Sequence, residues 1–270
     1  MDKFLPLKQI VEKYNLAAKK SLGQNFLFDQ NLTDKIVRAS GNVTGKNILE
    51  IGPGPGGLTR SILACNISKL VAIEPDIRCI EALKELQNHY GDKFEIVNGD
   101  ALKIAVKDIF PTGMKIIANL PYNIATVLFF QWLNDIEYFE SLTLMFQKEV
   151  AMRIIAKPST KAYGRVSVMA QAFADIEHAF DIPPSAFVPR PKITSSVINI
   201  IPHNKNPHID KSKLSNLCKI AFNHRRKLLK SALSSFIPNI LEIYEQLDIH
   251  PNARAEELTI EQFCKLSKFL

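Results

Sequence analysis

The sequence predicts an α/β protein: a domain of βαβ units with a parallel sheet, followed by a small all-helical C-terminal domain. In the first two-thirds of the chain, short β-branched runs alternate with amphipathic stretches. A glycine-rich stretch follows the first of these runs, and helical periodicity replaces the alternation beyond residue 203. A chain of 270 residues is long enough for one large core and a small additional domain. We therefore expect two domains, residues 1–202 and 203–270.

The expected strands are Asn47 to Ile51, Lys69 to Glu74, Phe94 to Val97, Lys115 to Ala118 and Ser141 to Phe146. The expected helices between them are Leu58 to Ala64, Ile77 to Tyr90 and Ala125 to Leu133. Because strands alternate with helices, a parallel sheet is expected. Asp29 is expected to cap a helix that continues to Ser40, and the extended run Ile193 to Ile201 is expected to complete the sheet.

The C-terminal part begins after a polar stretch, Pro202 to Pro207, that is typical of a linker. Beyond it the apolar residues recur at helical spacing. The first helix is expected to bury Leu214, Leu217, Cys218 and Ala221, the next Leu228, Leu229 and Leu233, and a last helix is expected from Ile260 to Phe269.

The bulk composition indicates a globular, cytoplasmic protein, and nothing in it requires more than a monomer. Hydrophobic residues make up 46% and charged residues 23%, which excludes a disordered or fibrous chain. No apolar run approaches the ~20 residues that span a bilayer, and the N-terminus resembles neither a secretory signal nor a transit peptide. The cysteines are too widely spaced for a zinc site and are expected to be buried or incidental: Cys65, Cys79, Cys218 and Cys264.

Basic residues are concentrated between His203 and Lys230. This window holds eight basic residues and one acidic residue, so its charge of +7 equals the net charge of the whole chain. Because binding to a polyanion releases condensed counterions, such a segment indicates a nucleic-acid partner. A solvated helix face rich in lysine would give the same pattern, and charge alone does not choose between the two.

The first expected strand runs directly into the glycine-rich stretch Glu50-Ile51-Gly52-Pro53-Gly54-Pro55-Gly56-Gly57-Leu58. Glycines let a backbone turn sharply and approach a ligand closely. At the carboxyl end of a strand in this kind of sheet, they indicate a nucleotide-like ligand. Gly52, Gly54 and Gly57 also satisfy the dinucleotide pattern G-x-G-x-x-G, so the motif alone fits both NAD and S-adenosylmethionine.

Two acids end the next two expected strands. Glu74 follows Gly52 at about the usual ~20-residue offset for a carboxylate that binds both ribose hydroxyls. Asp100, in Asn98-Gly99-Asp100-Ala101, is placed to accept a hydrogen bond from an adenine amino group, which an NAD site needs less. The alternative is that both acids only cap helices. Their position at successive strand ends beside the glycine loop favours a site for S-adenosylmethionine.

The fourth strand ends in Asn119-Leu120-Pro121-Tyr122, which indicates methyl transfer to an amino nitrogen. The nitrogen of an adenine amino group is a poor nucleophile because its lone pair is delocalised into the ring. Acceptors on its hydrogens, here the Asn119 side-chain oxygen and the Leu120 carbonyl, would draw it toward tetrahedral geometry. Pro121 fixes the turn, and Tyr122 offers a ring on which an extruded base stacks. Taken alone, the tetrapeptide is also typical of an ordinary strand-ending turn.

At this point the chain closely resembles the ribosomal RNA adenine dimethyltransferase family over nearly its whole length. The resemblance rests on Lys20-Ser21-Leu22-Gly23-Gln24-Asn25-Phe26-Leu27, Glu50-Ile51-Gly52-Pro53-Gly54, Asn119-Leu120-Pro121-Tyr122, Phe187-Val188-Pro189-Arg190-Pro191-Lys192-Ile193 and Phe222-Asn223-His224-Arg225-Arg226-Lys227. It implies a Rossmann-like methyltransferase that uses S-adenosyl-L-methionine. Its substrate would be N6 of two adjacent adenosines near the 3′ end of 16S rRNA in the small ribosomal subunit, with a role in subunit biogenesis.

The resemblance also implies roles for individual residues. The cofactor pocket would be lined by Asn25, Leu27, Gly52, Gly54, Glu74, Asp100 and Asn119. Phe187 resembles a second aromatic residue that sandwiches the adenine against Tyr122, whereas periodicity alone places Phe187 in the core. Arg225, Arg226 and Lys227 would bind RNA.

Three alternatives remain. A related class methylates one adenine of large-subunit RNA, but the segment from Phe187 to Ile193 and the basic triplet from Arg225 to Lys227 disfavour it. A ribosome assembly factor would act by binding, with methylation secondary. An NAD oxidoreductase is disfavoured because the tetrapeptide from Asn119 to Tyr122 has no role in hydride transfer.

Overall fold

A computed structural model describes residues 4–16, 23–206, 208–223 and 227–270. The chain forms two compact units, each made of two segments. The first contains Met1–Ala151 and Glu177–Ile201, and the second contains Met152–Ile176 and Pro202–Leu270. Residues 152–176 thus group with the C-terminal part, and the expected division into domains at residue 202 stays a prediction.

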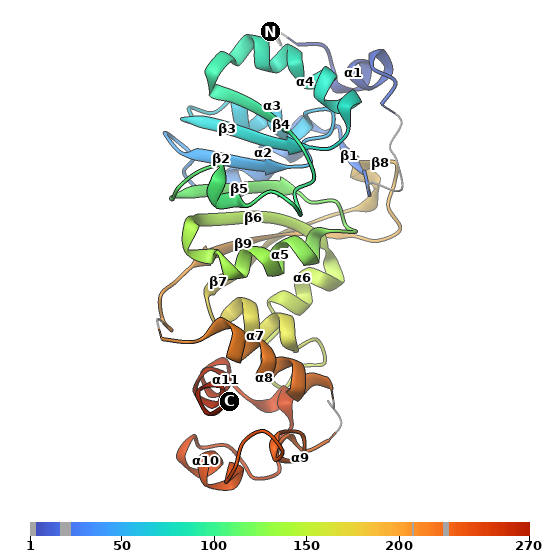
Figure 1. The fold of residues 1–270 in the computed structure, drawn as a ribbon. Helices are drawn as coiled ribbons and strands as arrows, with labels where there is room; N and C mark the ends of the chain where they lie inside the picture. The colour runs from blue at the N-terminus through green and yellow to red at the C-terminus, as the bar shows by residue number, and fades with distance from the viewer. Residues whose placement is uncertain (1–3, 17–22, 207, 224–226) are drawn as a thin grey trace. The chain divides into compact units, whose positions relative to one another are not determined.

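The first unit is built on a sheet in which seven strands of the described chain follow the order β4-β3-β2-β5-β6-β9-β7 (Figure 1). The strands are β2 (Asn47–Ile51), β3 (Lys69–Glu74), β4 (Phe94–Asn98), β5 (Met114–Asn119), β6 (Phe139–Gln147), β7 (Ala174–Ile182) and β9 (Ser195–Pro202). The pairs from β4 through β6 are parallel, whereas β9 runs antiparallel to β6. The five expected strands and the completing role of β9 are confirmed, and the sheet is mixed rather than wholly parallel.

Four helices of this part lie where the sequence predicted them: α2 (Gln30–Ala39), α3 (Gly57–Leu63), α4 (Ile77–Tyr90) and α5 (Ala125–Asn134). Two more, α1 (Leu7–Lys13) and α6 (Lys148–Ile154), were not predicted. The Asp29 carboxylate accepts the Asn31 N–H at 2.9 Å and caps α2 as predicted. Asp76, not Glu74, caps α4 by accepting the Arg78 N–H. Glu74 is therefore left available for another role.

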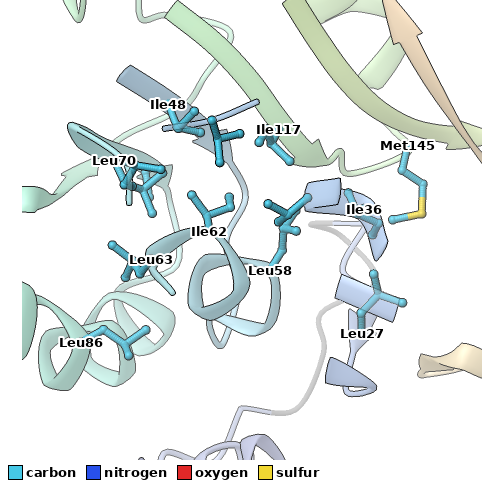
Figure 2. Close-up of a cluster of buried hydrophobic side chains, with 14 of the residues drawn as sticks. Leu27, Ile36, Ile48, Leu58, Ile62, Leu63, Leu70, Leu86, Ile117 and Met145 are labelled. Atoms are coloured by element: carbon cyan, nitrogen blue, oxygen red, sulfur yellow. The ribbon is translucent and has the colours of Figure 1, made fainter. Parts of the chain in front are cut away.

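A cluster of aliphatic side chains holds helices α2, α3 and α4 against the sheet (Figure 2). Helical residues such as Ile36 and Ile62 meet strand residues such as Ile48, Leu70 and Ile117, each no more than 1% exposed. Truncating one such residue to Ala typically costs about 2–5 kcal/mol of stability. This packing holds the carboxyl ends of the strands, and the loops that follow them, in a fixed position.

The second unit is mainly helical, with α7 (Arg165–Gln171), α8 (Lys211–Asn223), α9 (Leu229–Leu233), α10 (Ile240–Gln246) and α11 (Ile260–Leu266). Helix α8 buries the predicted face of Leu214, Leu217, Cys218 and Ala221. Thr259 caps α11 by accepting the Gln262 N–H. Tyr163 is buried and donates its hydroxyl to the Leu258 carbonyl at 2.9 Å, which ties the two segments of this unit together. Among the described residues, none of the helices is long and apolar enough to cross a membrane.

Two strand pairings were not anticipated. β1 (Phe26–Leu27) and β8 (Phe187–Val188) form a separate antiparallel pair and lie side by side in Figure 1. Strand β7 is at the edge of the large sheet, and most of its residues are partly or fully exposed. A two-residue strand has no periodicity to detect, and an exposed edge strand lacks the apolar run of a buried one.

Candidate active site

A cavity of about 300 Å³ opens at the carboxyl ends of β2, β3, β4 and β5. This edge is where sheets of this kind bind ligands. The lining comes from four stretches that follow strands and from one N-terminal stretch. It includes all seven predicted cofactor residues: Asn25, Leu27, Gly52, Gly54, Glu74, Asp100 and Asn119.

The glycine loop turns directly after β2 and cannot accept larger side chains. Gly52 and Gly54 have φ values of 67° and 55°, in the left-handed region. A Cβ on Gly54 would lie 3.0 Å from the Phe26 ring, and a Cβ on Gly57 would lie 2.6 Å from the Leu27 carbonyl oxygen. The backbone of this loop therefore forms one wall of the cavity without side chains in the way.

Glu74 is buried, 3% exposed, and joins β3 to the glycine loop. One carboxylate oxygen accepts the Gly54 N–H at 3.0 Å, and the other accepts the Asp76 N–H at 2.9 Å. Burial raises the pKa of Glu74, and these two hydrogen bonds oppose that rise. Each oxygen has a second lone pair, so the carboxylate can accept two more hydrogen bonds from a ligand in the cavity.

Asp100 lies just beyond β4 and is less buried than Glu74. Its Oδ1 accepts the Leu102 N–H at 3.0 Å, which orients the carboxylate. Among the described residues, its Oδ2 has no hydrogen-bond partner. Asp100 therefore both caps the turn that begins there and presents a free acceptor at the cavity, so one function does not exclude the other.

Asn119, the last residue of β5, is oriented by the N-terminal stretch. Its Nδ2 donates to the Asn25 carbonyl at 3.1 Å. Because a carbonyl can only accept, the amide nitrogen must face Asn25, and Oδ1 is the atom left for a ligand. The side chain is thus held with its oxygen as a free hydrogen-bond acceptor, and its predicted contact with an adenine amino group stays a prediction.

The turn after Asn119 is fixed at both ends. The Pro121 carbonyl accepts the N–H of Ile124 at 3.1 Å and of Ala125 at 3.0 Å, which starts α5. The Tyr122 hydroxyl forms a short hydrogen bond with the Oγ of Ser195, a fully buried residue at the start of β9. Burial raises the pKa of Tyr122 above its usual value. The ring therefore stays neutral and is held at the cavity wall, where a base can stack on it.

Residues 15–270 match the family Ribosomal RNA adenine dimethylase. The chain belongs to this family. "Ribosomal RNA small subunit methyltransferase A" of Xanthobacter autotrophicus is 45% identical over 99% of this chain and 94% of its own length. The protein of the same name from Agrobacterium fabrum is 44% identical over 100% of this chain and 99% of its own length. The predicted resemblance to this family is confirmed. The protein is a methyltransferase.

Solved structures agree with the expected class of fold. A dimethyladenosine transferase from Plasmodium falciparum has a TM-score of 0.79 and 28% identity, covering 89% of this chain and 95% of its own. The 23S rRNA methyltransferase ErmE has a TM-score of 0.71 and 22% identity, covering 91% of this chain and 99% of its own. The predicted Rossmann-like methyltransferase fold is confirmed. Membership of the dimethylase family supports S-adenosylmethionine as the methyl donor.

Other predicted residues lie apart from the cavity or outside the described residues. Phe187 in β8 is 2% exposed, packs in the core cluster and is not among the residues lining the cavity. Its contact with an adenine stays a prediction and requires that its surroundings open. Arg225 and Arg226 lie outside the described residues, and Lys227 is exposed.

Glu50 also lines the cavity, and the sequence did not predict a role for it. It is 1% exposed, at the end of β2, and accepts the Thr59 hydroxyl at 2.8 Å. Burial, with a smaller contribution from the charge of Glu74, raises the pKa of Glu50 to about 8. An acid inside an otherwise apolar buried strand was the signal that could have revealed it. Two buried carboxyl groups make the cavity suited to a cationic ligand.

Proposed function

We propose that this protein transfers methyl groups from S-adenosylmethionine to N6 of two adjacent adenosines in a hairpin loop near the 3′ end of 16S rRNA. The product is N6,N6-dimethyladenosine in the small ribosomal subunit, and the reaction serves the biogenesis of that subunit. The observation that carries the proposal is the Asn119 amide, whose oxygen is presented to the cavity beside Tyr122. The names of the two bacterial relatives support the choice of RNA.

The residues around the cavity fit S-adenosylmethionine. The glycine loop lets the bulky cofactor lie close to the backbone. The free lone pairs of the Glu74 carboxylate match the two ribose hydroxyls of the cofactor. Asp100 has a free oxygen for the adenine amino group of the cofactor. Asn25 and Leu27 complete the lining, with the Leu27 carbonyl packed against Gly57 of the glycine loop. When bound, this cofactor supplies an electrophilic methyl group on a cationic sulfur, whose positive charge would favour the ionised form of the buried Glu50 carboxyl group.

The target base is held by the stretch after β5. The Asn119 oxygen and the Leu120 carbonyl accept the two hydrogens of the adenine amino group, which directs the nitrogen lone pair at the methyl carbon. Tyr122 stacks on the base, worth about 1–3 kcal/mol, and Phe187 is proposed to cover its other face. The new N–C bond forms as the S–C bond breaks. The methylated nitrogen becomes acidic and releases its proton to water, so positioning supplies most of the rate.

The remaining parts of the proposal concern the partner and the setting. The C-terminal domain, residues 203–270, is proposed to bind ribosomal RNA through Arg225, Arg226 and Lys227. The protein is proposed to act in the cytoplasm as a monomer.

The function is tested with purified protein, S-adenosylmethionine and small ribosomal subunits that lack the modification. Mass spectrometry of the digested RNA is expected to find two adjacent N6,N6-dimethyladenosines. The Asn119→Ala variant is the control that must lose this product. Methylation of large-subunit RNA instead would support the related class of methyltransferase that acts on large-subunit RNA. Binding to small subunits without methyl transfer would support a ribosome assembly factor.

A further inference from the structure

We propose that a loop at the rim of the cavity, residues 189–194, binds the RNA backbone next to the target adenosine through Arg190 and Lys192. This inference rests on the proposed function, because it adds a second RNA contact to the same site. Residues 189–194 form the rim loop.

Both ends of the rim loop are attached to the walls of the cavity. At its start, Val188 pairs in register with Phe26 of β1, and Phe26 lines the cavity. At its end, Ser195 bonds to the hydroxyl of Tyr122, the residue on which the adenine is proposed to stack. Figure 1 shows the chain leaving β8 beside β1 and returning to the large sheet at β9. The loop therefore runs past the place where the target base enters.

The end of the rim loop nearest Tyr122 is held firmly. The Thr194 carbonyl accepts the backbone N–H of Lys148 at 2.9 Å. The ammonium group of Lys148 in turn donates to Asp181 at 2.6 Å, and the Ser196 hydroxyl donates to the same carboxylate at 2.6 Å. Pro189 and Pro191 restrict the backbone further. A loop held in this way loses little conformational entropy when it binds a ligand.

The two charges of the rim loop form no ion pair among the described residues. Arg190 and Lys192 are exposed, and neither has an ion-pair or hydrogen-bond partner among the described residues. No acidic residue occurs between Ile182 and Thr194. The nearest acid before this stretch, Asp181, is already bonded to Lys148, His178 and Ser196.

Phosphate is the group that suits this arrangement. A guanidinium group binds phosphate oxygens in a bidentate manner, and an ammonium group binds them as a point charge. An adenosine extruded onto Tyr122 brings its own flanking phosphates to the rim. The apolar side chains of Val188 and Ile193, 50% and 41% exposed, flank the two cations and can contact ribose or base surfaces. The rim loop is therefore an RNA-binding element rather than a surface for an acidic protein.

The test compares two double variants of the full-length protein. Arg190→Gln with Lys192→Gln removes the rim charges. Arg38→Gln with Lys93→Gln is the matched control, since both residues are exposed and have no partner among the described residues. Lys93 directly precedes β4, and Arg38 lies near Ser40, whose carbonyl accepts from Lys115 at the start of β5. Both control residues thus belong to the amino edge of the sheet, opposite the cavity.

For the rim variant, the KM for unmethylated small subunits should rise by roughly tenfold for each lost charged contact. The slope of log affinity against log salt should fall by roughly 0.7 to 0.9 per contact. The rate at saturating subunits and the affinity for S-adenosylmethionine should match those of the wild type. The control variant should match the wild type in every measurement.

The outcomes separate the possible failures. An unchanged KM and slope in the rim variant overturn the rim-loop proposal while leaving the enzyme's function intact. A raised KM with an unchanged salt slope also overturns it, because the loop would then contact a protein or a base rather than phosphate. If the wild type itself does not methylate small subunits, both the proposed function and the rim-loop proposal are wrong. If the rim variant also loses affinity for S-adenosylmethionine, the Arg190→Lys variant decides whether the rim loop binds phosphate. This variant keeps the charge, so its slope of log affinity for the small subunit against log salt must equal that of the wild type.

Discussion

The acids of the cavity and the basic residues of the C-terminal window are arranged in opposite ways. Glu50 and Glu74 are buried, and each makes specific hydrogen bonds that hold it in one position. In the window from His203 to Lys230, basic residues such as Lys213, Lys219 and Lys227 are exposed. A small ligand is recognised by a few fixed groups, whereas a polyanion is recognised by charge density. Changes in the cavity should therefore be large and insensitive to salt, and changes in the window should be smaller and sensitive to salt.

The largest effect is expected from Asn119→Ala. Its oxygen orients the amino group during methyl transfer, and loss of one such contact typically lowers the rate by about a hundredfold or more. Single-turnover methyl transfer at saturating cofactor measures this, with subunit binding expected to change little. A variant that reacts near the wild-type rate would remove Asn119 from the mechanism.

The next effect is expected from Glu74→Ala, which should weaken S-adenosylmethionine binding by a few kcal/mol. Both ribose hydroxyls lose a charged acceptor, and the Gly54 N–H loses its partner. Calorimetry measures the affinity, with Asp92→Ala as an exposed acidic control that precedes β4. Equal affinities for the two variants would contradict the role of Glu74 in ribose binding.

A smaller, salt-dependent effect is expected from Arg225→Ala combined with Arg226→Ala. If this segment binds the RNA backbone, the slope of log affinity for the small subunit against log salt should fall by roughly 0.7 to 0.9 per contact. Sedimentation titrations at several salt concentrations compare the variant with the wild type, and cofactor binding should be unchanged. Coincident slopes in a folded variant would mean that the window is only a solvated helix face.

The pH should also alter cofactor affinity, through Glu50. Its pKa of about 8 means that the carboxyl group is mostly protonated at neutral pH. A cationic ligand binds the ionised form more tightly, so affinity should increase from pH 6 to pH 7.5, by at most about tenfold per unit. Glu50→Gln should abolish this increase. A wild-type affinity that stays flat over this range would show that Glu50 does not titrate in response to the ligand.

The smallest effect is expected from Ser195→Ala, which removes the hydrogen bond that positions Tyr122. A neutral hydrogen bond contributes about 0.5–1.5 kcal/mol, so the rate should fall by a few-fold. Tyr122→Phe removes the same bond from the other side and keeps the ring. The double variant should therefore be no slower than either single variant, and additive losses would contradict a shared role.

Much of the fold was predictable because its signals are local. Strands β2 and β3 and helix α4 begin and end at the predicted residues, since apolar periodicity and the cap at Asp76 lie within each segment. The same holds for the chemistry at the strand ends. In parallel strands the carboxyl ends meet at one edge, so Glu74, Asp100 and Asn119 were expected to share a site, and all three line the cavity.

Only the tertiary structure decided the contacts between residues that are distant in sequence. Asn119 bonds to Asn25, and Tyr122 bonds to Ser195; neither pair has a local pattern that predicts it. The sequence by itself determined which groups stand at the carboxyl edge of the sheet, because strand order along the chain and strand ends are encoded nearby. The orientation of those groups depends on chain segments that the fold brings together, and hydrogen bonds between such segments leave no periodic signal in either one.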